Sequence, residues 1–275
     1  LYLLNLVPFL VIGQTQSENY SKVTTYKVPT STSISNPSQN EASIEVTYYD
    51  GLGRPIQKVA NKQSNSGKDI ITHIEYDAFG RQAKEYLPYV STSSNLSFDA
   101  NGLQNTLNFS DVLSPSMTPI NYIGEKPYSE KLYENSPLNR VLKQAATGNT
   151  WGLGNSHEIQ FDYQTNVTLE VVKFRADAVW DSSLGLYDIT LVTDDYYLPN
   201  QLYKTITKNE NWVSGSDNTT EEFKDKEGRV VLKRTYNDQE AYDTYYVYDI
   251  YGNLTYVIPP KVEISNATNT EILDN

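Results

Sequence analysis

Apolar and polar residues alternate along several short segments of the chain, with the period of two that is typical of half-buried β-strands. The segments that follow this pattern are residues 44–48, 70–76, 159–163, 167–171, 187–191, 202–206, 244–248 and 253–258. No segment combines a sustained helical period with capping residues. The pattern therefore predicts an all-β fold, in which consecutive antiparallel hairpins form an extended curved sheet with a long irregular insertion.

A six-residue turn pattern occurs four times between these strands. Its copies are Tyr49-Asp50-Gly51-Leu52-Gly53-Arg54, Tyr76-Asp77-Ala78-Phe79-Gly80-Arg81, Lys224-Asp225-Lys226-Glu227-Gly228-Arg229 and Tyr248-Asp249-Ile250-Tyr251-Gly252-Asn253. The Asp can accept backbone N–H groups, and the Gly can take the left-handed conformation that closes a hairpin loop. The Arg after the Gly either contacts the Asp and holds the strand register or lies free on the surface. The candidate structural residues are Asp50, Gly53, Arg54, Asp77, Gly80, Arg81, Asp225, Gly228, Arg229, Asp249, Gly252 and Asn253.

The segments between these turns are less regular. Residues 91–127 contain many turn formers and predict a long irregular insertion, with a weak helical candidate at 111–117. Gln164-Thr165-Asn166 predicts a tight reversal between two strands. Ser136-Pro137-Leu138-Asn139-Arg140, which follows Tyr133-Glu134, has the character of a stretched copy of the turn, with Asn139 in the position of the Gly.

At these residues the chain resembles the Rhs/YD-repeat family of secreted bacterial proteins, which is named after the Tyr-Asp-x-x-Gly-Arg pattern. Further segments resemble the uncharacterised domain at the start of many large members: residues 136–141, 150–155 and 222–234. The resemblance implies hairpins that join into a hollow shell, which in the family encloses a toxin or supports adhesion. This chain departs from the pattern at Lys224, where the family has Tyr, and at Asn253, where it has Arg. It also lacks counterparts of the family's self-cleaving segment and toxin.

Composition and charge narrow the range of partners. The chain has 275 residues, 38% of them hydrophobic, and a net charge of −12, which disfavours nucleic acid or an anionic membrane as a partner. It contains no cysteine, so its stability must come from packing and not from disulfides.

The two ends of the chain and its composition predict five segments. Residues 1–13 are mostly apolar and resemble a truncated signal peptide, although a buried first strand is an alternative. This segment implies a secreted or cell-surface protein with no membrane span after processing. The expected segments are 1–13 (signal peptide), 14–43 (extended polar leader with an edge strand at 22–28), 44–212 (N-terminal β domain), 213–261 (hairpins of the YD repeat) and 262–275 (linker tail).

Candidate catalytic and metal-binding groups are few. His73 and His157 are the only histidines, and no neighbouring residues complete a zinc site or a catalytic triad around them. Two carboxylate clusters, Asp188 with Asp194-Asp195 and Asp238 with Glu240 and Asp243, could form the acid/base pair of a glycosidase, but solvated strand ends explain them more simply. Asp99-Ala100-Asn101-Gly102 lacks the ligands of a calcium loop and predicts a turn.

The sequence thus favours a non-enzymatic structural module without a cofactor, which opens the β shell of a secreted repeat protein. Its expected partners are the repeats that follow in the same polypeptide. The alternative is an extracellular module that binds glycans or mediates adhesion, with Trp151 beside two glycines as a ring for stacking on a sugar. Trp180 and Trp212 admit the same two interpretations, a stacking platform or a buried plug.

Overall fold

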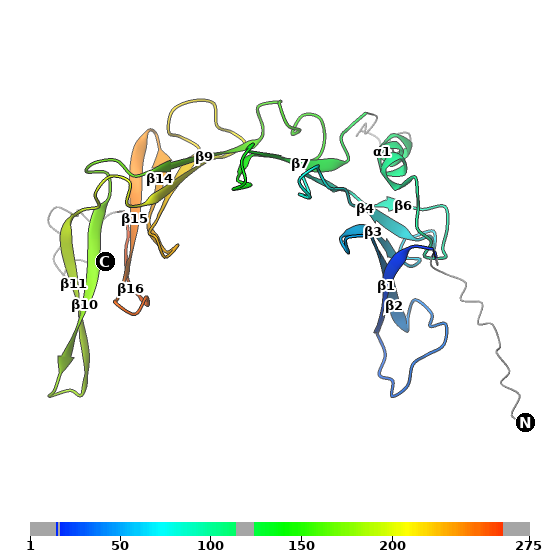
Figure 1. The fold of residues 1–275 in the computed structure, drawn as a ribbon, viewed down its shortest axis with the longest axis horizontal. Coiled ribbons are helices and arrows are strands. Elements are labelled where there is room, and N and C mark those ends of the chain that lie inside the picture. Colours follow the sequence, from blue (N-terminus) through cyan, green and yellow to red (C-terminus); the bar gives the residue numbers. More distant parts are fainter. Residues whose placement is uncertain (1–14, 16, 114–123, 261–275) are drawn as a thin grey trace, which may run out of the picture. The chain divides into compact units, whose positions relative to one another are not determined.

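The computed structural model describes residue 15, residues 17–113 and residues 124–260 (Figure 1). Among these residues, all regular elements except one α-helix are β-strands, which pair in antiparallel fashion. The expected all-β fold of consecutive hairpins is therefore confirmed. The expected signal peptide (1–13) and linker tail (262–275) lie outside the described residues.

The chain forms two compact units, and the first comprises the described residues of Leu1–Leu132 and Ala145–Asn155. Its main sheet has five strands in the order β1-β2-β3-β4-β6. A second pair of strands, β5 with β7, and helix α1 complete the unit. The bounds are β1 Asn19–Tyr26, β2 Ala42–Tyr49, β3 Pro55–Ala60, β4 Ile70–His73, β5 Lys84–Tyr86, β6 Tyr89–Val90, α1 Gly102–Leu113 and β7 Tyr128–Tyr133.

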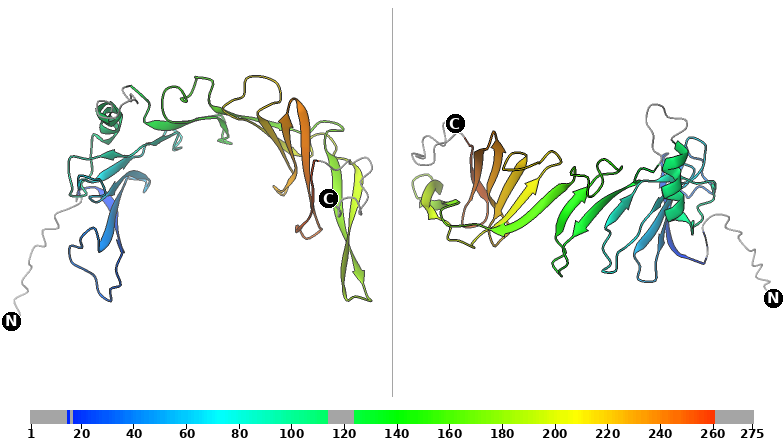
Figure 2. Two further views of the ribbon diagram at one scale, coloured as in Figure 1. Left: turned by 180° about the vertical axis from the view of Figure 1, so that it is seen from behind. Right: turned by 90° about the horizontal axis from the view of Figure 1, so that it is seen from above.

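The second unit comprises Tyr133–Gln144 and the described residues of Ser156–Asn275. Its strands follow the order β16-β15-β14-β13-β12-β9-β8, and a separate two-stranded ribbon, β10–β11, packs on this sheet (Figure 2). The bounds are β8 Val141–Ala145, β9 Ile159–Thr165, β10 Val172–Asp181, β11 Leu186–Tyr196, β12 Tyr203–Lys208, β13 Thr219–Lys224, β14 Val230–Asn237, β15 Glu240–Tyr248 and β16 Leu254–Ile258.

Each unit has its own hydrophobic core. In the first unit, Val46, Tyr48 and Val59 are completely buried between the sheet and the loop that contains Leu96. In the second unit, Phe223 and Leu232 of the sheet pack with Phe174 of the ribbon. Because strands alternate their side chains between two faces, the residues between the buried positions of β2 and β13 lie mostly on the opposite faces and are partly or fully exposed.

Helix α1 corrects the expectation that residues 91–127 are irregular, with a helical candidate only at 111–117. The helix begins at Gly102, after Asp99, whose carboxylate accepts the N–H of Asn101 at 2.9 Å. Its Phe109 ring lies 6.4 Å from that of Tyr89, on β6. Tertiary packing of this kind can stabilise a helix whose sequence alone gives a weak signal. Residues 114–117 of the candidate lie outside the described residues.

The predicted strand at 167–171 and the reversal at Gln164-Thr165-Asn166 are wrong. β9 continues to Thr165 and pairs with β12, and residues 167–171 form a loop in which Leu169 has a φ of +58°. Asn166 organises this loop, because its buried side chain accepts the N–H groups of Gln201 and Leu202 at 2.9 and 2.8 Å. The strand in the polar leader is present, but it spans Asn19–Tyr26 and not 22–28.

Candidate functional site

The Asp50 turn joins β2 to β3 and shows how this sequence pattern fixes a hairpin. One carboxylate oxygen of Asp50 accepts the N–H groups of Leu52 and Arg54, both at 2.9 Å. The other oxygen accepts a hydrogen bond from Nε of Arg54, at 2.8 Å. Gly53 has a φ of +77°, in the left-handed region where a side chain would be strained. The Arg54 backbone N–H, with help from its side chain, holds the pKa of Asp50 below its ordinary value.

The other three turns repeat this geometry. Arg81 Nε donates to Asp77 at 2.8 Å and Arg229 Nε donates to Asp225 at 2.7 Å, so neither guanidinium lies free on the surface. In the last turn, the shorter Asn253 donates its side-chain N–H to Asp249 at 2.9 Å. The amide of Asn253 thus replaces the guanidinium within the turn, and its side chain lowers the pKa of Asp249.

A fifth, stretched turn joins β7 to β8, where Glu134 stands in the position of the Asp. Its carboxylate accepts Nε and Nη2 of Arg140 at 2.9 and 2.7 Å. Asn139 has a φ of +54°, so it takes the conformation that Gly has in the other turns. The side chain of Arg140 lowers the pKa of Glu134 to about 2. The longer Glu therefore spans a loop that is longer than those of the Asp turns.

Three of the arginines also connect their hairpin to a tyrosine further along the chain. The guanidinium of Arg54 lies 4.5 Å from the centre of the Tyr76 ring, and the Tyr76 hydroxyl donates to the carbonyl of Pro55 at 2.9 Å. The same two contacts occur twice in the second unit. Arg229 lies 5.0 Å from the centre of the Tyr248 ring, and the Tyr248 hydroxyl donates to the Val230 carbonyl at 3.0 Å. Arg140 lies 4.7 Å from the centre of the Tyr163 ring, and the Tyr163 hydroxyl donates to the Val141 carbonyl at 2.8 Å.

The glycines of the turns allow this connection. A Cβ atom at Gly80 would lie 3.1 Å from Nη1 of Arg54, and one at Gly252 would lie 3.6 Å from Nη1 of Arg229. The arginine of one turn therefore packs against the glycine of the next turn as well as against its tyrosine. The sequence signals the Asp–Arg pair, but nothing in its local pattern signals this contact between successive turns.

Several of the candidate catalytic groups take part in packing or in ion pairs within the fold. His73 packs edge-on against Tyr86 at 5.4 Å, and burial lowers its pKa despite the opposing effect of Glu75. Asp243 forms a two-bond pair with Arg234, at 2.6 and 2.8 Å, and Asp194 pairs with Arg175. Within the described part of the chain, no group of three or more His, Asp or Glu side chains could hold a metal ion.

The tryptophans differ in their surroundings. Trp151 is 43% exposed, and its carbonyl accepts the N–H of Ala146 at 3.1 Å, in a loop of the first unit. Trp212 donates its indole N–H to Gly215 and lies under the ammonium group of Lys208. Trp180 lies near the end of the β10–β11 ribbon and is 54% exposed. Stacking of Trp151 on a sugar stays a prediction.

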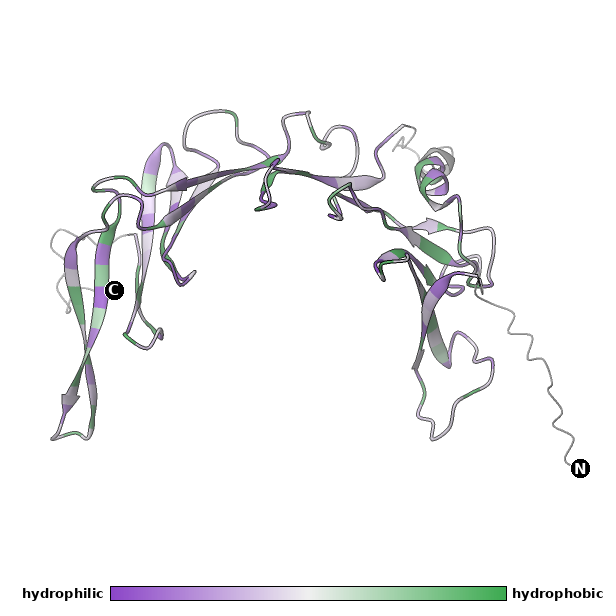
Figure 3. Cartoon of the chain, in the orientation of Figure 1, coloured by the Kyte–Doolittle hydropathy of each residue, from purple (hydrophilic) through white to green (hydrophobic). Residues whose placement is uncertain are grey.

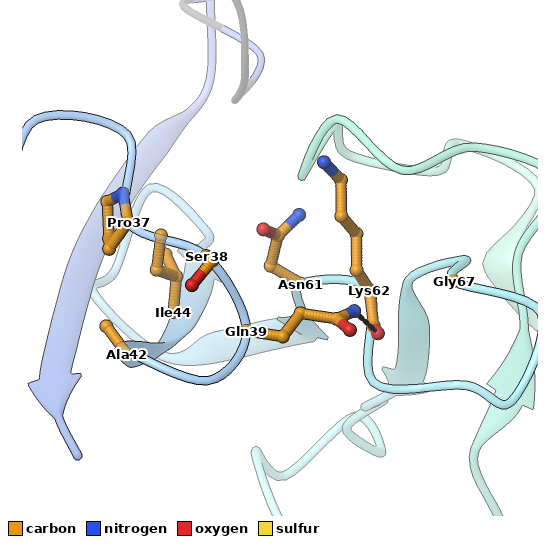
Figure 4. A pocket seen from close by; sticks show the side chains of 8 residues that line it. All are labelled: Pro37, Ser38, Gln39, Ala42, Ile44, Asn61, Lys62 and Gly67. Atoms are coloured by element: carbon orange, nitrogen blue, oxygen red, sulfur yellow. Dashed lines mark hydrogen bonds between the residues drawn. The ribbon is translucent and has the colours of Figure 1, made fainter. Parts of the chain in front are cut away.

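The described residues of the first unit line surface cavities, among them a larger and a smaller one. The larger, about 330 Å³, lies between the loop that precedes β2 and the turn after β3, which are joined by a hydrogen bond from Gln39 to the Lys62 carbonyl (Figure 4). Its lining residues are Pro37, Ser38, Gln39, Ala42, Ile44, Asn61, Lys62 and Gly67. The smaller, about 180 Å³, includes Asp99, which already accepts the Tyr89 hydroxyl and the Asn105 amide. Neither lining contains the facing carboxylates of a glycosidase.

Comparisons with solved structures find the Tc toxin complexes. The chain is similar to the crystal structure of TcdB2-TccC3-TEV, with a TM-score of 0.45 and 14% identity over 86% of this chain and 10% of that one. It is also similar to the structure of the Photorhabdus luminescens Tc holotoxin pore, with a TM-score of 0.40 and 16% identity over 83% of this chain and 9% of that one. The chain spans about a tenth of the length of these solved chains.

The other comparisons concern the sequence itself. No curated protein matches the chain. In the described residues, no helix has the length and apolar character needed to cross a membrane. A family model described as a domain of unknown function, DUF6443, matches residues 22–165, which is more than half of the chain and includes the Asp50, Asp77 and Glu134 turns. The chain therefore belongs to the DUF6443 family.

Proposed function

We propose that this chain is a non-enzymatic structural module, which opens the β shell of a secreted or cell-surface Rhs/YD-repeat protein of the toxin-enclosing kind. The observation that carries the proposal is the contact from turn to turn, in which an arginine pairs with its own Asp and packs on the tyrosine of the following hairpin. A hairpin built in this way presents a docking position for another hairpin of the same type.

Each contact contributes little by itself. The Asp–Arg pairs are partly exposed, with Arg54 at 37% and Asp50 at 21% side-chain exposure, so solvent screening keeps the contribution of each pair to stability small. A cation over an aromatic ring at such a site adds about 0.5–1 kcal/mol. In repeat architectures, however, stability comes from many similar contacts between neighbours. The turn contacts fit the role of a repeating connector better than that of a binding site.

The free edge of β16 is the position where the next hairpin would add. In the described residues β16 pairs only with β15, so one row of its backbone groups has no strand partner. The side chains of Leu254 and Val257 on this strand are 51% and 48% exposed. A free edge of this kind accepts a further strand through main-chain hydrogen bonds.

The experiment is a binding assay at this edge. A fluorescent peptide of residues 240–258, which carries β15, the Asp249 turn and β16, serves as the added hairpin, and anisotropy reports its binding to the full chain. We expect saturable binding to the unaltered chain. We expect Val257→Lys to weaken it about tenfold, or about 1.4 kcal/mol, because a lysine on an edge strand opposes strand addition.

The control is Val213→Lys, the same substitution at a side chain that is 86% exposed in the loop between β12 and β13. It should leave binding unchanged. If the peptide shows no saturable binding to the unaltered chain, the edge is not a docking position and the proposed function is wrong.

A further inference from the structure

The β10–β11 ribbon has one largely apolar face and one mixed face, which carries the charged side chains together with Val179, Leu186 and Val192. Phe174, Ala176, Ala178 and Trp180 alternate along β10, and their cross-strand partners on β11 include Leu191, Ile189 and Tyr187. The opposite face carries Arg175, Asp177, Asp188 and Asp194, among others. Figure 3 shows the resulting alternation of hydrophobic and hydrophilic residues along the ribbon. An amphipathic ribbon of this kind needs a partner along the whole length of its apolar face.

The sheet of the second unit covers the first half of this face. Phe174 is 9% exposed and lies edge-on against Tyr245 of β15, with 5.1 Å between the ring centres. Further along the ribbon, the hydroxyl of Tyr256 on β16 donates to the carbonyl of Ile189 at 2.7 Å. The ribbon thus contacts β15 near the start of β10 and the edge strand β16 further along, and Figure 1 shows the tip of the ribbon extending past the end of β16.

The second half of the face has no cover among the described residues. Trp180 and Tyr187 pair across the two strands with their ring centres 5.1 Å apart, and they are 54% and 52% exposed. They follow the Ala178–Ile189 pair directly, on the same face as the buried Phe174. The exposed rings therefore continue the apolar face of an existing interface, as the next pair on that face after Ala178–Ile189, where Tyr256 of β16 contacts the ribbon.

We propose that the Trp180–Tyr187 pair receives an inward-facing apolar or aromatic side chain of the β-strand that pairs with the free edge of β16. Each of the last two strands already places an aromatic side chain, Tyr245 or Tyr256, against the ribbon. Because neighbouring strands of a sheet twist in one direction, the contact with a straight ribbon shifts further along it with each added strand. A strand beyond β16 therefore meets the ribbon at Trp180 and Tyr187.

This inference rests on the proposed function, and it gives the ribbon a role as a template for the next hairpin. A charged or strongly polar occupant does not suit the position, since both rings present apolar surface and the acidic groups lie on the other face of the ribbon. The occupant is thus a strand with the same alternation as β15 and β16.

The experiment uses the full chain and the fluorescent peptide of residues 240–258. Trp180→Thr and Tyr187→Thr keep a strand-forming residue but remove the ring. We expect each to weaken peptide binding about tenfold. The matched control is Val179→Thr, on the opposite face of the same ribbon and 60% exposed. It should leave binding unchanged.

A second measurement observes the position directly. In a chain that carries Trp151→Phe and Trp212→Phe, Trp180 is the single indole, since the sequence has three tryptophans. Its emission should shift to shorter wavelength when the peptide, which contains no tryptophan, is added. Rising chain concentration alone should leave it unchanged.

The possible failures are distinguishable. If the peptide binds the unaltered chain and Trp180→Thr equally well, the ribbon has no part in docking and this inference falls, while the proposed function stands. If no variant binds the peptide, the proposed function itself fails. If the emission of Trp180 shifts with chain concentration and without peptide, a second copy of the chain covers the ribbon and the inference is overturned.

Discussion

Alanine at Gly53 and at Gly80 offers a matched test of the contact between successive turns. Both glycines have a φ of +77°, so either substitution costs about 1–2 kcal/mol for an L-residue in the left-handed region. Around Gly53, a Cβ would meet nothing within 4 Å, whereas at Gly80 it would lie 3.1 Å from Nη1 of Arg54. The difference between the two variants therefore isolates the effect of the arginine.

The expected difference in stability between the two variants follows from the contact that Arg54 would lose with Tyr76. A methyl group at Gly80 pushes the guanidinium away from the Tyr76 ring, where it lies 4.5 Å from the ring centre. At a partly exposed site this contact is worth about 0.5–1 kcal/mol. We expect Gly80→Ala to destabilise the first unit by about 0.5 kcal/mol more than Gly53→Ala. In a chain that also carries Arg54→Gln, the difference should vanish.

Urea unfolding with a reporter for the first unit measures this difference. Trp151 lies in the first unit, while Trp180 and Trp212 lie in the second, so a chain with Trp180→Phe and Trp212→Phe reports the first unit alone. This separation matters because a chain with two compact units need not unfold in one step. Equal destabilisation by the two alanines, with and without Arg54→Gln, would refute a connection between the turns through Arg54.

Two further predictions concern charged pairs of the second unit. Arg140 lowers the pKa of Glu134 to about 2, below its unfolded value, so this pair contributes stability above about pH 4.5 that is lost as the pH falls toward 2. In Arg140→Gln, the urea midpoint followed by Trp212 should therefore fall less steeply between pH 5 and pH 2, and an unchanged slope would contradict it. Asp243→Asn should destabilise the second unit by about 2–3 kcal/mol at pH 7, because it removes the charge and one of the two acceptor oxygens that the mostly buried Arg234 uses. Asp188→Asn, on the exposed strand β11, should destabilise the second unit by less than about 0.5 kcal/mol, and an effect equal to that of Asp243→Asn would show that the Arg234 pair is not special.

The roles of Asp, Gly and Arg in the turns could be predicted from the sequence because they are local. Asp50 and Arg54 are four residues apart, and the turn that joins them follows from the properties of Asp and Gly. The partner of Arg54 in the next hairpin could not be predicted in the same way. Tyr76 lies far along the chain, and its position over Arg54 depends on how β3 and β4 pair.

The alternation of apolar and polar residues predicted a strand wrongly at 167–171, where a buried polar side chain determines the local structure. Val167 and Leu169 alternate like strand residues, but the hydrogen bonds of Asn166 hold this segment as a loop, and both side chains are largely exposed. Helix α1 shows the reverse case, since its sequence gives little helical signal and its packing on β4 and β6 supplies the stability. In both cases a contact distant in sequence overrides the local pattern.

The second unit fixes its strand register at two separate places. At the turn end of the hairpins, the Asp–Arg–Tyr contacts connect one hairpin to the next. In the middle of the sheet, Lys204, Glu221, Arg234 and Asp243 stand on the adjacent strands β12 to β15 with alternating charge.

These four side chains form a continuous ladder, in which Lys204 lies 3.0 Å from Glu221 and Arg234 pairs with Asp243 at 2.6 Å. A shift of one residue between any two strands would turn one of these charged groups to the other face and leave its partner unpaired in a mostly buried site. The ladder thus opposes the slippage to which repeats of similar sequence are prone, and it acts independently of the turns. The proposed addition of a further strand at β16 would need both constraints, because an error in any earlier register would displace that edge.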